Sequence, residues 1–321
     1  MLVDPFLSAA LRQQLLNHQG LSKQLLQKQH SYLNFYGLSR LLALADYELS
    51  CLRSGQYEVV YQYWRPKQDF LKGSFYLCHG YYDHVGLYGH LMSTLLEAGY
   101  AVIAFDLPGH GLSSGARASI ISFDDYTQAL WQVVQQTEAK VPKPLHLIGQ
   151  STGGAVVIDW WLRSGFAEQV PIACSVLLAP LVKPLHWQRA LLSYHLLSPF
   201  LTRLKRKFSC NSHNENFLQF LPSDPLQARY LMVNWVNALK LWIPEIEQAD
   251  PISTPVLILQ GEGDHTVDWR YNTALLKEKF PDATVEFFPE ARHHLVNESV
   301  MIRTQWQRKL QLFLQRFAES T

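Results

Sequence analysis

The sequence lacks three features that would narrow its class at once: abundant cysteine, an excess of one charge, and a long apolar run. Its four cysteines, Cys51, Cys78, Cys174 and Cys210, are widely scattered, which argues against a disulfide framework or a metal-binding knuckle. A formal net charge of +1 with 17% charged residues excludes a broadly nucleic-acid-binding protein. No uncharged apolar run approaches the roughly 18 residues that span a bilayer.

The opening stretch MLVDPFLSAALRQQ also lacks a basic region followed by an apolar core and a cleavage site. With so few cysteines, we therefore expect a reducing, cytoplasmic environment. What the chain does have is 321 residues, 48% of them hydrophobic, which is enough for one large α/β domain with an insertion.

The first part of the chain, residues 1–55, is predicted to be a helical extension. Asp4 and Pro5 form a typical helix start, leucines follow at helical spacing, and Gly20 is a helix stop. A second helix is predicted from Leu21 and a third over 38–49. Packing against the main domain is the first interpretation of these helices, and an amphipathic surface for a membrane or a partner is the alternative.

Residues 56–180 and 251–321 are predicted to form an α/β core. The run YEVVYQYW at 57–64 is rich in β-branched and aromatic residues and predicts the opening strand. Short apolar runs then alternate with helix-length segments. The predicted strands are 74–80, 101–106, 144–150, 175–180, 255–261 and 284–290, and the predicted helices are 87–98, 124–139, 152–164, 270–280 and 298–318. This alternation indicates a mostly parallel sheet with helices on both faces.

Residues 181–250 interrupt that rhythm and contain no comparable strand. Because ligands bind at the carboxyl edge of parallel sheets, we interpret this aromatic-rich insertion as a helical cap over the site. Within it, RLKRKF at 203–208 places four cations beside apolar residues. Such a patch either rests on anionic headgroups or forms an ordinary solvated face.

The candidate nucleophile is Ser151, in the stretch HLIGQSTGGAVV. It directly follows an apolar strand and directly precedes a helix, with Gly149 and Gly153 two positions to either side. A sharp strand–turn–helix bend requires residues without side chains at those two positions, so that strand and helix can approach each other. A serine and glycines that serve only as a helix cap are the alternative.

A serine hydroxyl needs a base to accept its proton, and the base needs an orienting partner. Asp264 follows one later strand, and the adjacent His293 and His294 follow the last one. The order Ser, Asp, His is expected when the nucleophile lies on a middle strand. Spacing alone does not choose between the two histidines, and Asp268 and Glu262 are further candidates for the acid.

An oxyanion would be stabilised by two backbone N–H groups. Thr152 supplies one at the start of the helix that follows the nucleophile. Tyr81 supplies the other, because Gly80 lets the loop CHGYYDH come close. We expect His79 and His84 to brace this loop rather than to react.

Together these motifs resemble the α/β-hydrolase superfamily, in particular its monoacylglycerol lipase and lysophospholipase branch of serine aminopeptidase-type hydrolases. The resemblance covers roughly 57–180 and 251–318. It rests on HGYYDH with Tyr88, FDLPGHGLSSG, GQSTGG, GEGDHTVD and ARHHLVNE. In that branch the last motif begins with the catalytic base, so the resemblance selects His293 over His294. It likewise implies Asp264 as the acid, Ser151 as the nucleophile, and the backbone groups of Tyr81 and Thr152 as oxyanion donors.

The resulting hypothesis is a serine esterase that acts on a monoacylglycerol or lysophospholipid through an acyl-enzyme, without a metal or an organic cofactor. Rival hypotheses are an aminopeptidase or amidase, an acyltransferase, and a binding module without turnover. A peptidase would need cap carboxylates to hold a free amine, and Glu215, Asp224, Glu245 and Glu247 are the candidates. The expected partner is a small acyl ester, with membrane contact through the cap or the N-terminal helices as an additional possibility.

Overall fold

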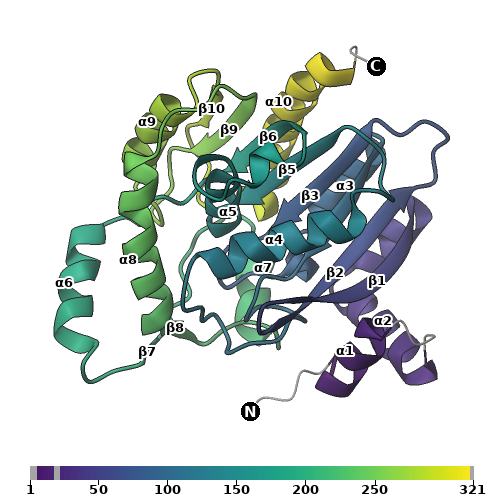
Figure 1. Ribbon diagram of the computed structural model, residues 1–321, viewed down its shortest axis with the longest axis horizontal. Helices are drawn as coiled ribbons and strands as arrows, with labels where there is room; N and C mark the ends of the chain where they lie inside the picture. The colour runs from purple at the N-terminus through teal and green to yellow at the C-terminus, as the bar shows by residue number, and fades with distance from the viewer. Residues whose placement is uncertain (1–5, 18–21, 319–321) are drawn as a thin grey trace.

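An eight-stranded sheet forms the centre of the computed structural model, which describes residues 6–17 and 22–318 (Figure 1). The strand order is β1-β2-β4-β3-β5-β6-β9-β10. β2 is antiparallel to both of its neighbours, and all other pairs are parallel. The strands are β1 (Ala45–Ser54), β2 (Tyr57–Pro66), β3 (Gly73–Cys78), β4 (Tyr100–Phe105), β5 (Leu145–Gln150), β6 (Ile172–Leu178), β9 (Val256–Gly261) and β10 (Thr284–Phe288).

Helices cover both faces of the sheet and enclose two hydrophobic cores. One core is closed by α1 (Ala9–Leu16), α2 (Lys23–Phe35), α3 (Gly89–Glu97) and α10 (Val300–Ala318). The other is closed by α4 (Asp124–Thr137), α5 (Thr152–Leu162), α8 (Val233–Gln248) and α9 (Trp269–Lys279). Short 3-10 turns lie at η1 (Leu38–Ala43), η2 (Val85–Leu87), η3 (Phe166–Glu168), η4 (Leu221–Ser223) and η5 (Leu295–Asn297). The predicted mostly parallel α/β fold is therefore confirmed.

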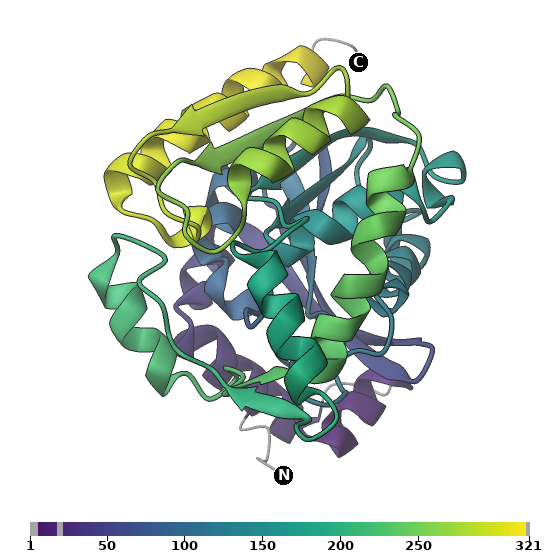
Figure 2. The same ribbon diagram turned by 90° about the vertical axis from the view of Figure 1, so that its left-hand side faces the viewer.

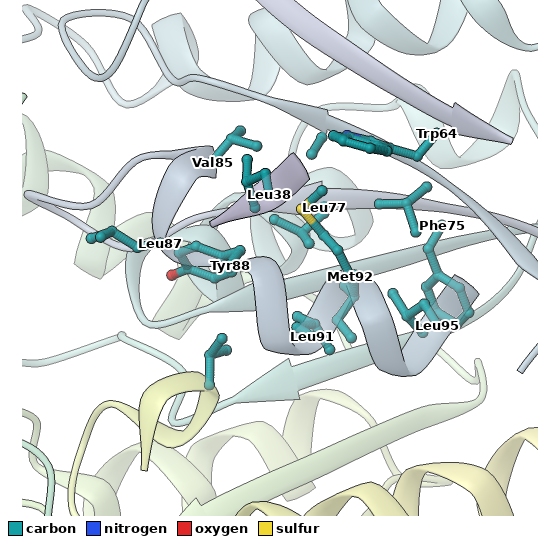
Figure 3. Packing of buried hydrophobic residues seen from close by; sticks show 14 of the residues in the cluster. Leu38, Trp64, Phe75, Leu77, Val85, Leu87, Tyr88, Leu91, Met92 and Leu95 are labelled. Carbon is teal, nitrogen blue, oxygen red and sulfur yellow. The ribbon is translucent and has the colours of Figure 1, made fainter. Parts of the chain in front are cut away.

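The alternation of side chains along each strand explains why both faces need helices. Phe75 and Leu77 of β3 belong to one core, whereas Tyr76 belongs to the other. Figure 3 shows Leu91 and Met92 of α3 packed beside the strands of the first core. Each such fully buried side chain contributes about 1.5–3 kcal/mol relative to exposure. The sheet is thus held from both sides, and its carboxyl edge becomes a rigid base for loops.

The N-terminal segment differs from its prediction in two ways. Asp4, Pro5 and Gly20 lie outside the described residues, and α1 begins only after Ser8, whose side chain accepts the N–H of Leu11. The expected third helix ends at Ala43 as the 3-10 turn η1, and the prediction of helix up to residue 49 was wrong.

The residues after η1 instead form β1, which pairs with β2 over its full length, from Ala45 opposite Pro66 to Ser54 opposite Tyr57. A two-residue turn with Gly55 at φ +55° joins the two strands. The sheet therefore starts before the predicted core boundary at residue 56. Pairing with the adjacent strand β2 overrode the local helical spacing of the leucines.

The segment between β6 and β9, where the sequence predicts a cap over 181–250, forms a separate layer (Figure 2). It contains α6 (Trp187–Leu197), β7 (Arg203–Lys205), α7 (Glu215–Phe220), β8 (Tyr230–Met232) and α8. The expectation that this insertion lacks strands was wrong in one detail, because β7 and β8 form a short antiparallel ribbon. Trp242 of α8 fastens this layer to the core, since its Nε1 donates to the buried Asp159 carboxylate at 2.7 Å.

No helix in the described ranges combines the length and the apolar character needed to cross a membrane.

Candidate active site

Ser151 occupies the tight turn between β5 and α5. Its backbone has φ +53° and ψ −115°, a strained conformation that a non-glycine residue rarely adopts. The flanking glycines explain how strand and helix approach so closely. A Cβ on Gly149 would lie 2.2 Å from the carbonyl oxygen of Gly153, and a Cβ on Gly153 would lie 2.0 Å from that of Cys78. The predicted strand–turn–helix bend is therefore present, and both glycines are required sterically.

The structure brings together the three side chains that the sequence singles out. His293, in the loop after β10, has its Nε2 atom 2.9 Å from Ser151 Oγ. Its Nδ1 atom lies 2.7 Å from Oδ2 of Asp264, in the loop after β9. All three side chains are more than nine-tenths buried. Since the carboxylate accepts the Nδ1 proton, Nε2 is left free to accept the serine proton.

The alternative acids and the alternative histidine lie elsewhere. Asp268 caps α9, where its side chain accepts the N–H of Tyr271. His294 turns away from the serine and lies 3.1 Å from Asp83. Asp264 is held in place by the backbone N–H groups of Thr266 and Val267.

Electrostatic interactions favour an ionised Asp264 and raise the basicity of His293 beside it. Burial alone raises the pKa of Asp264, but the charge and hydrogen bond of His293 and the two backbone N–H groups outweigh burial and hold that pKa below its ordinary value. Burial likewise lowers the pKa of His293, whereas the charges of Asp264 and Asp83 raise it, with a net increase. The arrangement thus strengthens the histidine as a base while its partner stays ionised.

The loop after β3 lies against Ser151, as the oxyanion hypothesis requires. A Cβ on Gly80 would come within 3.5 Å of the Ser151 Cβ, so glycine allows the close approach. His79 braces the loop, because its Nε2 accepts the N–H of Leu107 and its Nδ1 therefore donates to Gly80 O. Thr152 is the first residue of α5, where N–H groups lack acceptors within the helix. Tyr81 and Thr152 line the same cavity as Ser151, and the predicted oxyanion role of their N–H groups stays a prediction.

Three residues for which the sequence did not predict this role, Tyr88, Asp83 and His294, support this loop from behind. The Tyr88 hydroxyl accepts the N–H of Gly80 at 2.8 Å and donates to Asp83 Oδ2 at 2.9 Å. His294 Nε2 is 3.1 Å from the same Asp83 oxygen, at ion-pair distance but without the alignment of a hydrogen bond. Burial raises the pKa of Asp83, but nearness to His294 outweighs burial and holds that pKa well below its ordinary value. His294, through Asp83, therefore supports the loop that carries Tyr81.

Gln150, the residue between Gly149 and the serine, holds the histidine loop. Its Oε1 accepts the N–H of Val296 at 3.0 Å, and its Nε2 donates to the carbonyl oxygen of His293 at 3.4 Å. The sequence signal for this supporting role is the position of Gln150 at the end of a buried strand, one residue before Ser151. Ser151 and His293 are thereby fixed to each other through backbone as well as side chains.

A cavity of about 410 Å³ opens above these groups, between the sheet and the cap. Ser151, Thr152, Tyr81 and His293 lie in its wall. Apolar cap residues form much of the rest: Leu181, Trp187, Leu197, Leu231, Trp235 and Val236. The site is therefore a largely apolar chamber with a few polar groups at one place, the usual form of a small-molecule site.

No group of three or more His, Cys, Asp or Glu side chains is arranged to hold a metal ion within residues 6–17 and 22–318.

Comparisons with known proteins agree with this geometry. The family model of the serine aminopeptidases, S33, matches residues 71–300. The monoglyceride lipase of Homo sapiens is 30% identical over 250 residues, which cover 76% of this chain and 82% of that protein. Phospholipase YtpA of Bacillus subtilis is 27% identical over 224 residues, 64% of this chain and 81% of that protein.

Solved structures share the fold. A soluble variant of monoglyceride lipase from Saccharomyces cerevisiae superposes with a TM-score of 0.73 at 19% identity, over 84% of this chain and 95% of that chain. The monoacylglycerol lipase of Paleococcus ferrophilus gives a TM-score of 0.65 at 24% identity, over 84% and 99% of the two chains. Because the sequence matches span most of the chain and the fold agrees, the chain belongs to the serine aminopeptidase S33 family and is a hydrolase of the α/β-hydrolase fold.

Proposed function

We propose that this hydrolase cleaves carboxylic esters of glycerol lipids, a monoacylglycerol or a lysophospholipid, with Ser151 as the nucleophile. The observation that carries the proposal is the hydrogen-bonded row Ser151–His293–Asp264 at the base of an apolar cavity. The named relatives support this substrate class, because they include monoglyceride lipases and a phospholipase.

In the proposed mechanism, His293 Nε2 removes the Ser151 proton while Oγ attacks the ester carbonyl carbon. The N–H groups of Tyr81 and Thr152 hold the oxyanion of the tetrahedral intermediate. Each such donor is worth about 10² to 10³ in rate. The alcohol then leaves with the proton from His293, and water repeats the cycle on the acyl-enzyme. Asp264 keeps the imidazole oriented and stabilises its positive charge.

The apolar side chains that line the cavity support a substrate with an apolar acyl group. Leu197 and Leu231 line it from the cap, so that an acyl chain can extend away from Ser151 between cap and sheet. Burial of each CH₂ group in such surroundings contributes about 0.8 kcal/mol. A short polar ester would gain little from these walls.

The positions of the cap carboxylates favour an ester over a peptide with a free amine. Asp224 is buried against His84, Glu245 lies 3.3 Å from Arg163, and Glu247 is paired with Lys183. Glu215 lies in the first turn of α7. All four are engaged or placed away from the residues that line the cavity.

A membrane surface is the proposed source of the substrate. Leu192 and Leu196 of α6 are each 63% exposed, and Phe200 is 83% exposed. The cations Arg203 and Lys205 of β7 follow directly and are exposed as well. Apolar and basic side chains together suit a surface of anionic headgroups.

Co-sedimentation with lipid vesicles tests this part of the proposal. We expect stronger binding to phosphatidylglycerol vesicles than to phosphatidylcholine vesicles, and we expect Phe200→Ser to weaken the binding. Equal binding of both kinds of vesicle would contradict this part of the proposal.

A labelling and turnover experiment tests the catalytic proposal. Wild type and Ser151→Ala are incubated with a fluorophosphonate probe, and separately with acyl esters, monoacylglycerols, lysophospholipids and aminoacyl amides. We expect labelling and ester turnover in the wild type only. Turnover of amides alone would indicate a peptidase, and an unlabelled, inactive wild type would indicate a binding module.

A further inference from the structure

Arg206 lies in the wall of the active-site cavity, directly after β7. Its guanidinium centre is 3.9 Å from the ring centroid of Tyr82 and 4.5 Å from that of Phe208. Tyr82 is the neighbour of Tyr81, so the cation lies beside the oxyanion loop. Its backbone is fixed as well, because its N–H donates to Arg229 O at 2.9 Å. The guanidinium is thus held at a defined place in the wall of the cavity that contains Ser151.

The hydrogen bonds of this guanidinium go to neutral groups and use only one of its nitrogens. Nη1 donates to Gln227 Oε1 at 2.6 Å and to Ala228 O at 3.3 Å. Gln227 is itself oriented, since its Nε2 donates to Asp224 at 3.3 Å. Within the part of the chain that the structure describes, Nε and Nη2 have no hydrogen-bond partner. An arginine has five donors in a fork that matches a phosphate, so donors remain for a ligand.

The charge of Arg206 is also left without a counterion. No carboxylate lies within ion-pair distance of it among the described residues. Asp83 is the acidic group whose field reaches it, but Asp83 lies against His294. Burial lowers the pKa of Arg206 below its ordinary value, as expected for a cation that has lost water without gaining an anion. Lys207 adds a second positive charge to the same cavity wall.

We propose that Arg206 binds the phosphate group of the substrate's glycerol part, so that the enzyme prefers phosphorylated monoacyl lipids over neutral monoacylglycerols. This inference rests on the ester-hydrolase function proposed above and narrows its substrate class. Tyr82 and Arg206 line the same cavity as Ser151, so a substrate with its ester carbonyl at Ser151 can place its glycerol side against them. A neutral glycerol group would leave the cation unpaired, whereas a phosphate completes its hydrogen bonds.

The test uses two substrates that differ only by a phosphate group: 1-acylglycerol and 1-acylglycerol 3-phosphate with the same short acyl chain, below their micelle concentrations. Monomeric substrates remove the effect of a charged lipid surface. We expect Arg206→Gln to lower kcat/KM for the phosphorylated substrate, relative to the neutral one, by about 10- to 100-fold. Arg206→Lys should recover part of that ratio, because it keeps the charge and loses the fork.

Arg229→Gln is the matched control. Its guanidinium is 5.8 Å from the Phe208 ring, and its side chain belongs to the same basic cluster without lining the cavity. We expect its substrate ratio to equal that of the wild type. Equal losses for both substrates in Arg206→Gln would show a structural role and overturn the proposal. A change in Arg229→Gln as large as in Arg206→Gln would overturn it too.

Calorimetric binding of glycerol 3-phosphate separates this inference from the catalytic proposal, because it needs no turnover. Wild type and Ser151→Ala should bind it, and Arg206→Gln should bind it at least about tenfold more weakly. Equally tight binding of inorganic phosphate would overturn the assignment to a lipid headgroup. A wild type that binds glycerol 3-phosphate but hydrolyses neither ester would refute the proposed function and leave the anion site standing.

Discussion

His84 Nε2 lies 2.8 Å from Asp224 Oδ2, and both side chains are completely buried. His84 belongs to the loop that carries Tyr81, and Asp224 belongs to the cap. The second oxygen of Asp224 accepts the hydroxyl of Tyr36, at the end of α2, at 2.6 Å. One carboxylate therefore ties together the N-terminal helices, the cap and the loop beside the nucleophile.

This pair predicts a loss of stability with a specific pH dependence. Asp224→Ala leaves a buried imidazole without its partner, and we expect it to lower the free energy of unfolding by about 3–5 kcal/mol near pH 6. Tyr36→Phe removes only one hydrogen bond and should cost about 0.5–1.5 kcal/mol. Urea unfolding measures both values; equal losses would contradict the central role of the carboxylate.

The sign of the pH effect follows from the two pKa shifts. Burial lowers the pKa of His84, but Asp224 outweighs burial and raises it above 6.5, so its stabilisation is complete below pH 6.5 and is lost as pH rises through the raised pKa. Burial raises the pKa of Asp224, but His84 brings it below 3.8, so its stabilisation is lost only as pH falls through that lowered pKa. The difference between wild type and Asp224→Ala should thus be largest between about pH 4 and 6.5 and shrink above. A difference that grows above pH 7 would be inconsistent with an ion pair.

The raised pKa of His293 predicts how activity depends on pH. The imidazole must be neutral to accept the serine proton, so kcat/KM should fall with decreasing pH through a pKa above 6.5. In Asp264→Asn the charge that raises this pKa is gone and burial remains. The acid limb should then move to lower pH, and the plateau should drop by about 10⁴-fold. An unshifted limb in the variant would mean that another group controls it.

The two adjacent histidines should respond very differently to substitution. His293→Ala removes the proposed base and should lower kcat by about 10⁴-fold or more. His294→Ala removes a support of Asp83 and should leave most of the turnover, with a loss below about tenfold. Steady-state kinetics on one ester, with circular dichroism as a check on folding, compares the two. A larger loss in His294→Ala would exchange their roles.

Gly153, in the turn after Ser151, allows a direct test of steric crowding. Gly153→Ala places a Cβ 2.0 Å from the backbone oxygen of Cys78, so strand β3 or helix α5 must shift. We expect a loss of at least about 1–3 kcal/mol of stability together with a strong loss of activity. The neighbouring Gly154→Ala meets nothing closer than 3.2 Å, from Pro180, and is the control. Similar thermal unfolding and activity of the two variants would contradict this account.

Sequence reasoning predicted the parts of the molecule in which local pattern and topology agree. Strands of a parallel sheet all end at one edge, so Asp264 and His293, each just past a strand, had to lie near Ser151. The same logic placed Gly80 beside the serine. The predicted proximity is present in the structure, with 2.7 Å between His293 Nδ1 and Asp264 Oδ2 and 2.9 Å between His293 Nε2 and Ser151 Oγ.

Structure that depends on contacts with another segment was not predictable in this way. The leucine spacing predicted a helix up to residue 49. The strand β1 forms there instead, because pairing with β2 stabilises it. The partnership of Tyr36 with Asp224 joins residues 188 positions apart, and no periodicity reports it. Arg206 was visible only as one cation in a basic run; its place in the cavity wall depends on how the cap folds.

The ring of Tyr81 lies flat on Trp235 of α8, with centroids 3.8 Å apart and an angle of 19° between the planes. In the proposed mechanism the backbone N–H of the same residue holds the oxyanion, so one amino acid would contact both the cap helix and the substrate. A movement of α8 away from the sheet would separate these two rings. Under the proposed mechanism, the position of the cap helix and that of the oxyanion donor are therefore coupled through a single aromatic stack.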